Sequence, residues 1–191
     1  MAVKEDIEKE QLIEQDVVDR AKKVLQNISK KETNRALTIE RLSLAIEAVE
    51  LSKEALRINK IGFAKTKDIL DRVRDNGKHD VNFIAQVEHV FSNLKKTIAE
   101  IEGEIYASEL SLNCVITLTE SNKGAGKIGS MLPKGKAANK QISDDIKHYE
   151  EGNEKRREII ASITDTNNNL TDIRCQVGAK VPTSENSTEK S

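Results

Sequence analysis

The fold is decided by the stretch Leu70-Asp71-Arg72-Val73-Arg74-Asp75-Asn76-Gly77-Lys78-His79-Asp80-Val81-Asn82-Phe83-Ile84. Its centre is the best turn signal in the chain, because Asn and Gly readily adopt the backbone angles of tight turns. On both sides, apolar residues recur at alternating steps of three and four, the spacing of a coiled-coil seam. Symmetric pairing about Gly77 predicts these layers: Leu70 with Ile84, Phe63 with Phe91, Leu56 with Ile98, Val49 with Ile105, and Leu42 with Leu112.

The chain is therefore predicted to be all-α, an elongated antiparallel coiled coil or helical bundle. It should contain three to four long helices, at about 4–28, 30–75, 80–119 and 141–178, with a hairpin tip at 75–78. Its 191 residues are 33% charged and 3% aromatic, which is typical of long helices rather than of a compact enzyme. Residues 1–178 should form a single elongated bundle, and 179–191 a disordered tail.

The first helix is amphipathic, and two arrangements of it are compatible with the sequence. One side carries apolar or small residues: Ile7, Val17, Ala21, Val24 and Ile28. Ser29-Lys30-Lys31-Glu32 has the pattern of a capping box, which would start a new helix there. No Gly or Pro forces a break, however, so one uninterrupted helix from about 4 to 74 is the alternative.

A second apolar stripe runs along the 30–75 helix at intervals of seven residues. It consists of Leu37, Leu44, Leu51 and Ile58. This stripe lies on the side opposite Leu42 and Val49, and a helix that is apolar on opposite sides is covered on both. The cover must be the first helix, the last helix or a partner chain, so the stripe is a candidate partner-facing surface.

The last helix has a seam that polar residues interrupt. Its heptad positions are Ile142, Ile146, Tyr149, Asn153, Arg156, Ile160, Ile163, Asn167, Leu170, Arg174 and Val177. Buried polar residues at such positions can select the register of helix pairing. The alternative, which we favour from sequence, is a wet seam at the edge of the bundle.

Residues 120–140 form the one long predicted connection, rich in glycine and lysine. Its glycines and lysines do not match a phosphate-binding loop, because Ser121 stands in place of the first glycine and Ile128 in place of the metal-binding hydroxyl. The candidate anion-binding or partner-binding residues are Lys123, Lys127, Lys134, Lys136 and Lys140. Such lysines could contact an acidic partner or an anionic membrane surface, and the alternative is a solvated connection.

Three further lysines, Lys53, Lys60 and Lys67, occupy seam positions of the 30–75 helix. Unpaired buried ammonium groups are costly, so their stems should lie along the seam with the charges in water. Three carboxylates are candidate partners on the facing helix: Glu88, Glu102 and Glu104.

No catalytic, cofactor or metal site is expected. His79, His89 and His148 lie in separate segments, and none has a His or Cys at metal-ligand spacing. The net charge of −1 gives no general attraction to nucleic acid. The two cysteines, Cys114 and Cys175, should lie too far apart to form a disulfide, and free thiols favour a reducing, cytoplasmic compartment.

The sequence thus predicts a non-catalytic structural or interaction protein. It would bind a partner protein, or itself as a homo-oligomer, through a helix face or its basic loop. One alternative is a peripheral membrane-binding bundle, although the acidic polar side of the 4–28 helix is atypical of such proteins. A less favoured alternative is a component of a helical pore-forming toxin, with 110–135 as the insertion element.

Overall fold

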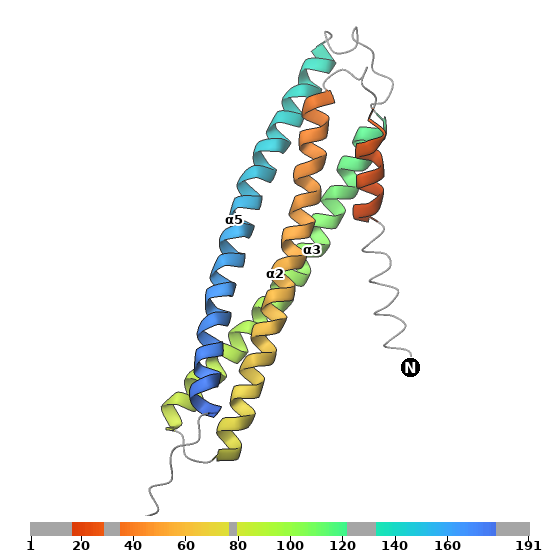
Figure 1. The fold of residues 1–191 in the computed structure, drawn as a ribbon. Helices are drawn as coiled ribbons and strands as arrows, with labels where there is room; N and C mark the ends of the chain where they lie inside the picture. The colour runs from red at the N-terminus through yellow and green to blue at the C-terminus, as the bar shows by residue number, and fades with distance from the viewer. Residues whose placement is uncertain (1–16, 29–34, 77–79, 122–132, 179–191) are drawn as a thin grey trace, which may run out of the picture.

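The computed structural model describes residues 17–28, 35–76, 80–121 and 133–178. Three long helices dominate it: α2 (Arg35–Asn76), α3 (Val81–Ser121) and α5 (Pro133–Gly178) (Figure 1). A short helical segment at 17–26 precedes them, and the described residues include no strand. The predicted all-α bundle is therefore confirmed. The tip residues 77 and 78, the connection at 122–132 and the tail at 179–191 lie outside the described residues.

Helices α2 and α3 form the predicted antiparallel pair. Three ion pairs join them, and as the α2 residue number rises the α3 number falls: Lys53–Glu109 at 3.0 Å, Lys60–Glu102 at 3.5 Å and Arg74–Glu88 at 3.1 Å. With 42 and 41 residues, the two helices extend for about 60 Å, since an α-helix rises about 1.5 Å per residue. The chain therefore reverses between Asn76 and Val81, where the turn signal lies.

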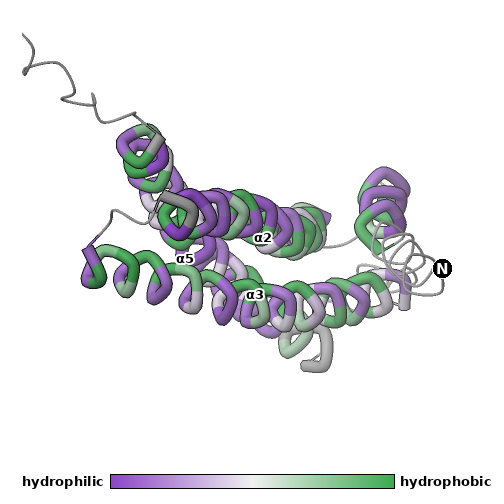
Figure 2. Tube along the Cα trace, turned by 90° about the horizontal axis from the view of Figure 1, so that it is seen from below, coloured by the Kyte–Doolittle hydropathy of each residue, from purple (hydrophilic) through white to green (hydrophobic). Residues whose placement is uncertain are grey.

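Helix α5 runs parallel to α2, and α2 packs against both α3 and α5, whereas α3 crosses behind α2 (Figure 1). Ion pairs again set the direction, because both numbers now rise together: Arg41–Asp145 at 3.2 Å, Glu47–Arg157 at 2.6 Å and Asp68–Arg174 at 2.6 Å. Hydrophobic and hydrophilic positions alternate along all three helices, as expected for amphipathic helices in a bundle (Figure 2).

The segment 17–28 folds back beside α2, near the last turns of α3. Its Val18, Ala21, Val24 and Ile28 share a hydrophobic cluster with residues of all three long helices, including Val49 of α2. Arg20 pairs with Glu120 at 2.8 Å, and Lys22 pairs with Glu50 at 2.8 Å. In one straight helix from 4 to 74, Lys22 and Glu50 would lie about 40 Å apart. The uninterrupted helix is therefore excluded, and the chain turns between residues 28 and 35.

The predicted seams of α3 and α5 are the buried faces of these helices. On α3 the buried predicted positions are Val87, Leu94, Ile101, Ile105, Ser108, Leu112 and Val115. On α5 they are Ile142, Ile146, Tyr149, Asn153, Ile163, Asn167, Leu170 and Val177. The layer of Phe63 and Phe91 is confirmed directly, since their rings stack with centroids 4.5 Å apart.

Helix α2 buries a line of residues that the predicted heptads do not include. Its members are Arg41, Ala45, Ala48, Ser52, Ala55, Asn59, Gly62, Thr66, Ile69 and Val73, which we call the central line. The central line lies between the Leu42 stripe and the Leu44 stripe, because α2 must face α3 and α5 at once. Most of its members are small or polar, so apolar periodicity alone does not reveal them.

Helix α5 begins earlier than the sequence predicted. Residues 133–140 were assigned to the connection, but the helix starts at Pro133. Proline is well suited to the first position of a helix, where its missing N–H has no intrahelical partner and its fixed φ already fits. The expectation of a non-helical connection over 120–140 is therefore wrong for its last third.

Candidate interaction surface

The predicted partner-facing stripe of α2 lies beside α5. Leu37, Leu44, Leu51 and Ile58 are all half-buried, and Leu44 and Ile58 pack against core clusters. The side-chain amide of Asn153 donates to the Leu44 carbonyl at 3.0 Å, and that of Asn167 donates to the Ile58 carbonyl at 2.8 Å. Of the three covers that the sequence allowed, the last helix is the one that lies here.

These asparagines also correct the interpretation of the α5 seam. Asn153 is fully buried and Asn167 is 6% exposed, so a wet seam is wrong for both. The amide nitrogen of each donates to a backbone carbonyl of α2 across a close helix–helix approach. Arg174, by contrast, is 46% exposed and pairs with Asp68 at the edge of the bundle.

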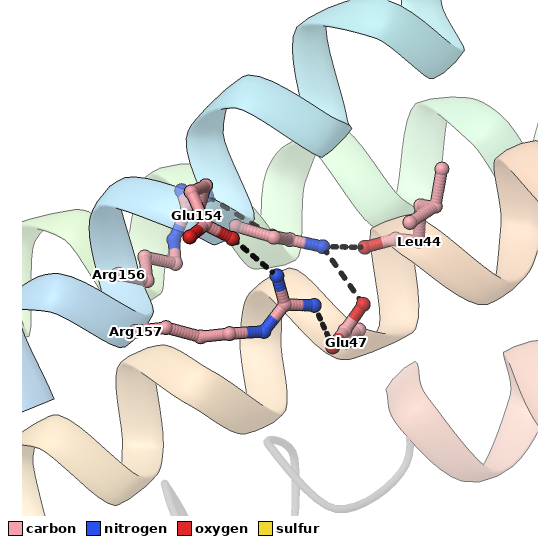
Figure 3. Close-up of polar contacts among 6 residues, drawn as sticks. Leu44, Glu47, Glu154, Arg156 and Arg157 are labelled. Atoms are coloured by element: carbon pink, nitrogen blue, oxygen red, sulfur yellow. Dashed lines mark hydrogen bonds and ion pairs between the residues drawn. The ribbon is translucent and has the colours of Figure 1, made fainter.

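A polar network ties α2 to α5 near the middle of the bundle (Figure 3). Arg157 bridges Glu47 of α2 at 2.6 Å and Glu154 of its own helix at 3.0 Å. The Glu47 carboxylate and then that of Glu154 raise the pKa of Arg157 above its ordinary value. Asn153 donates to Glu47 as well, at 3.2 Å. The network therefore fixes the register of α5 on α2.

Arg156 links all three long helices. Its guanidinium donates to Ser52 of α2 at 3.1 Å and to Ser108 of α3 at 3.4 Å, and it pairs with Glu104 of α3 at 3.1 Å. A second tie is the hydrogen bond between Tyr149 of α5 and Ser111 of α3. Burial raises the pKa of the Tyr149 phenol, and the hydrogen bond to Ser111 partly opposes this.

The seam lysines of α2 have partners that the sequence only partly predicted. The predicted pairing of Lys60 with Glu102 is confirmed. Two arginines pair with the other two candidate carboxylates, Arg74 with Glu88 and Arg156 with Glu104. Lys53 pairs with Glu109, which lies further along α3 than the three predicted carboxylates.

The five candidate lysines lie around the start of α5 or outside the described residues. Lys123 and Lys127 are outside, Lys134 and Lys136 lie in the first turn of α5, and Lys140 is exposed on that helix. Their role in anion or partner binding stays a prediction. Cys114 and Cys175 are both exposed and free, as expected.

One exposed face of α3 was missed by the sequence reasoning. It consists of Gly103, Ala107, Leu110, Cys114, Thr117 and Ser121, which we call the outer stripe. These residues alternate in steps of four and three and lie opposite the buried seam of α3. All six are exposed and uncharged, and two large apolar side chains flank them: Tyr106, 66% exposed, and Leu118, 46% exposed. The run of uncharged residues at heptad spacing could have indicated this face, but most of their side chains are too small to produce a clear apolar pattern.

The described residues hold no group of His, Cys, Asp or Glu that could bind a metal ion. Among them, too, no helix offers an apolar run of the length that a bilayer requires. Comparison with protein-family models, curated proteins and solved structures finds no match to this chain.

Proposed function

We propose that this protein is a non-catalytic interaction protein, a rigid helical rod that binds a protein helix through the outer stripe of α3. The observation that carries the proposal is the outer stripe itself. A surface helix of a bundle normally presents charged residues to water, whereas this face is uncharged from Gly103 to Ser121. Leu110, which is 49% exposed, lies at its centre.

The shape of the face supports a helical partner. Residues that repeat in steps of three and four form a straight seam along a helix, and a second helix is the element that matches such a seam. Small residues in the seam allow the two backbones to approach closely. Both described cysteines are free and exposed, which supports a reducing compartment such as the cytoplasm for this protein.

Photo-crosslinking from Cys114 tests the proposal. The full chain carrying Cys175→Ser is labelled at Cys114 with a maleimide benzophenone and irradiated in an extract of its source cells. We expect a discrete adduct whose protein component is identified by mass spectrometry. Leu118→Glu should abolish the adduct, because it places a charge beside the seam.

Ile61→Glu is the matched control, since Ile61 is 41% exposed on α2, away from the outer stripe. This control should leave the adduct unchanged. If the labelled chain keeps its helicity but forms no adduct that Leu118→Glu removes, the proposed function is wrong.

A further inference from the structure

The glycines of α2 and α3 differ in a way that bears on the outer stripe. Gly62 is required by packing within the chain, because a Cβ there would overlap the side-chain amide of Asn167. Packing among the described residues does not require a glycine at position 103, since a Cβ there would meet none of their atoms within 4 Å. A glycine inside a helix costs about 1 kcal/mol relative to alanine. Gly103 therefore leaves room for a close approach by a group outside the described residues.

The outer stripe is complementary to itself. A two-fold axis beside the outer stripe, at the level of Leu112, would place a second α3 antiparallel to the first. Gly103 would then lie opposite the partner's Ser121, Ala107 opposite the partner's Thr117, and Leu110 opposite the partner's Cys114. Each contact joins an a position to a d position, as an antiparallel coiled coil requires. Each also occurs twice, which is the property of a two-fold interface.

The charges of this part of α3 do not oppose such a pairing. Between Gly103 and Ser121 the only ionisable carboxylates are those of Glu104, Glu109 and Glu120, and each is paired within its own chain. Their partners are Arg156, Lys53 and Arg20 respectively. Two copies of the face would therefore meet without unpaired like charges, whose juxtaposition costs affinity.

The molecule already uses the same kind of seam inside the bundle. The central line of α2 has small residues at heptad spacing, with Ala48, Ser52 and Ala55 buried in the bundle interior. The outer stripe repeats that pattern on the opposite side of α3 from the core, with a glycine, an alanine and a serine among its six members.

We infer that the partner of the outer stripe is a second copy of this chain, so that two bundles form a homodimer through antiparallel α3 helices related by a two-fold axis at the level of Leu112. This inference rests on the proposed function and names its partner. A charged surface of another protein is a less suitable partner, because the outer stripe has no charged residue that could pair with it.

Mass in solution over a range of concentrations is the first test. The chain has a mass of 21.3 kDa, and we expect it to approach twice that value as concentration rises in light-scattering or sedimentation experiments. Leu110→Glu should weaken association at least about 100-fold, because each copy would bury an unpaired carboxylate. Ile61→Glu, on the exposed side of α2, should leave association unchanged. Circular dichroism should show full helicity for both variants.

Disulfide trapping tests the register. In the Cys175→Ser chain, Leu110→Cys should form a covalent dimer under mild oxidation, because position 110 lies opposite the partner's Cys114. Cys114 alone should cross-link far more slowly. The two Cys114 residues would be offset along the axis by about 6 Å in addition to the helix separation, beyond the span of a disulfide.

A chain that stays at 21.3 kDa at every concentration and forms no trapped dimer overturns the homodimer. If Cys114 photo-crosslinking still captures another protein that Leu118→Glu releases, the proposed function stands and only its partner changes. If neither dimer nor specific adduct forms while the fold is intact, both fail.

Discussion

Gly62 of α2 lies directly against the side chain of Asn167 of α5, with no room for a Cβ between them. Gly62 is buried, and the Asn167 amide nitrogen donates to the Ile58 carbonyl, one helical turn away, at 2.8 Å. The absence of a side chain at residue 62 therefore allows the amide to lie close to the α2 backbone. This contact sets the distance between the axes of α2 and α5 in the C-terminal halves of the two helices.

Gly62→Ala should destabilise the protein by about 1–3 kcal/mol, although alanine favours helix formation, because the added methyl group overpacks the interface. The Gly103→Ala variant is the matched control, since a Cβ there meets open space. At low protein concentration it should be neutral or stabilise the fold by up to about 1 kcal/mol. Urea denaturation followed by circular dichroism measures both, and equal effects for the two glycines would contradict the contact.

Asn167→Ala should remove most of the penalty of Gly62→Ala. The single change costs about 1–2 kcal/mol through the lost hydrogen bond, but it also frees the space that the methyl group needs. A double-mutant cycle over the same denaturation data gives the coupling between the two positions. Asn168→Ala, at the exposed neighbouring position, should show no coupling with residue 62. If the effects of the two substitutions on the free energy of unfolding are additive, Gly62 and Asn167 are not coupled and the predicted contact is contradicted.

The sequence was sufficient for the hairpin and for the seam of α3, because large apolar side chains repeat there at heptad spacing, and for the apolar positions of the α5 seam. Leu94, Ile101 and Leu112 are buried where the heptads place them. The burial of the central line of α2 could not be predicted from the sequence, because helix periodicity is recognised from large apolar residues. A helix that packs against two others buries small residues instead. Ala48 and Ser52 are almost completely buried, yet neither residue type indicates a buried helix face by itself.

The polar seam of α5 shows a second limit of sequence reasoning. Whether Asn153 is solvated or buried depends on a backbone carbonyl of α2, and the sequence does not show which carbonyl comes within reach. The outer stripe has the same origin as the central line, since Gly103 and Ala107 carry too little side chain to form a visible apolar pattern. Pro133 was a readable signal for the start of α5, because proline is common at the first position of a helix.

Ala48→Leu should destabilise the bundle by about 1–3 kcal/mol, because the side chain would be forced between α2 and its neighbours. Ala48 is 1% exposed on the central line. Ala64→Leu, on the exposed side of the same helix, should change stability by less than about 0.5 kcal/mol. Thermal and urea unfolding of the pair measures the difference. A central line that accepts leucine without loss would mean that α2 is not closely packed against α3 and α5.

Asn153→Ala should lower the free energy of unfolding by about 1–3 kcal/mol, because it removes a fully buried amide and its hydrogen bonds to Leu44 and Glu47. Asn169→Ala, at an exposed position of the same helix, is the control and should have little effect. Hydrogen exchange adds a local measurement, since the α5 amides around position 153 should lose protection in the variant. Unchanged stability and exchange would indicate that Asn153 does not hold α5 to α2.

Tyr149 should make the protein less stable at alkaline pH. Burial raises the pKa of its phenol in the folded state, so the unfolded chain loses this proton first as the pH rises. The stabilisation is therefore complete below the unfolded pKa of about 10, and it falls as the pH increases from there through the folded pKa. Tyr149→Phe removes the titrating group and should flatten this part of the stability profile. Urea denaturation of both proteins between pH 8 and pH 11 measures it, and parallel profiles would mean that the folded state does not shift this phenol.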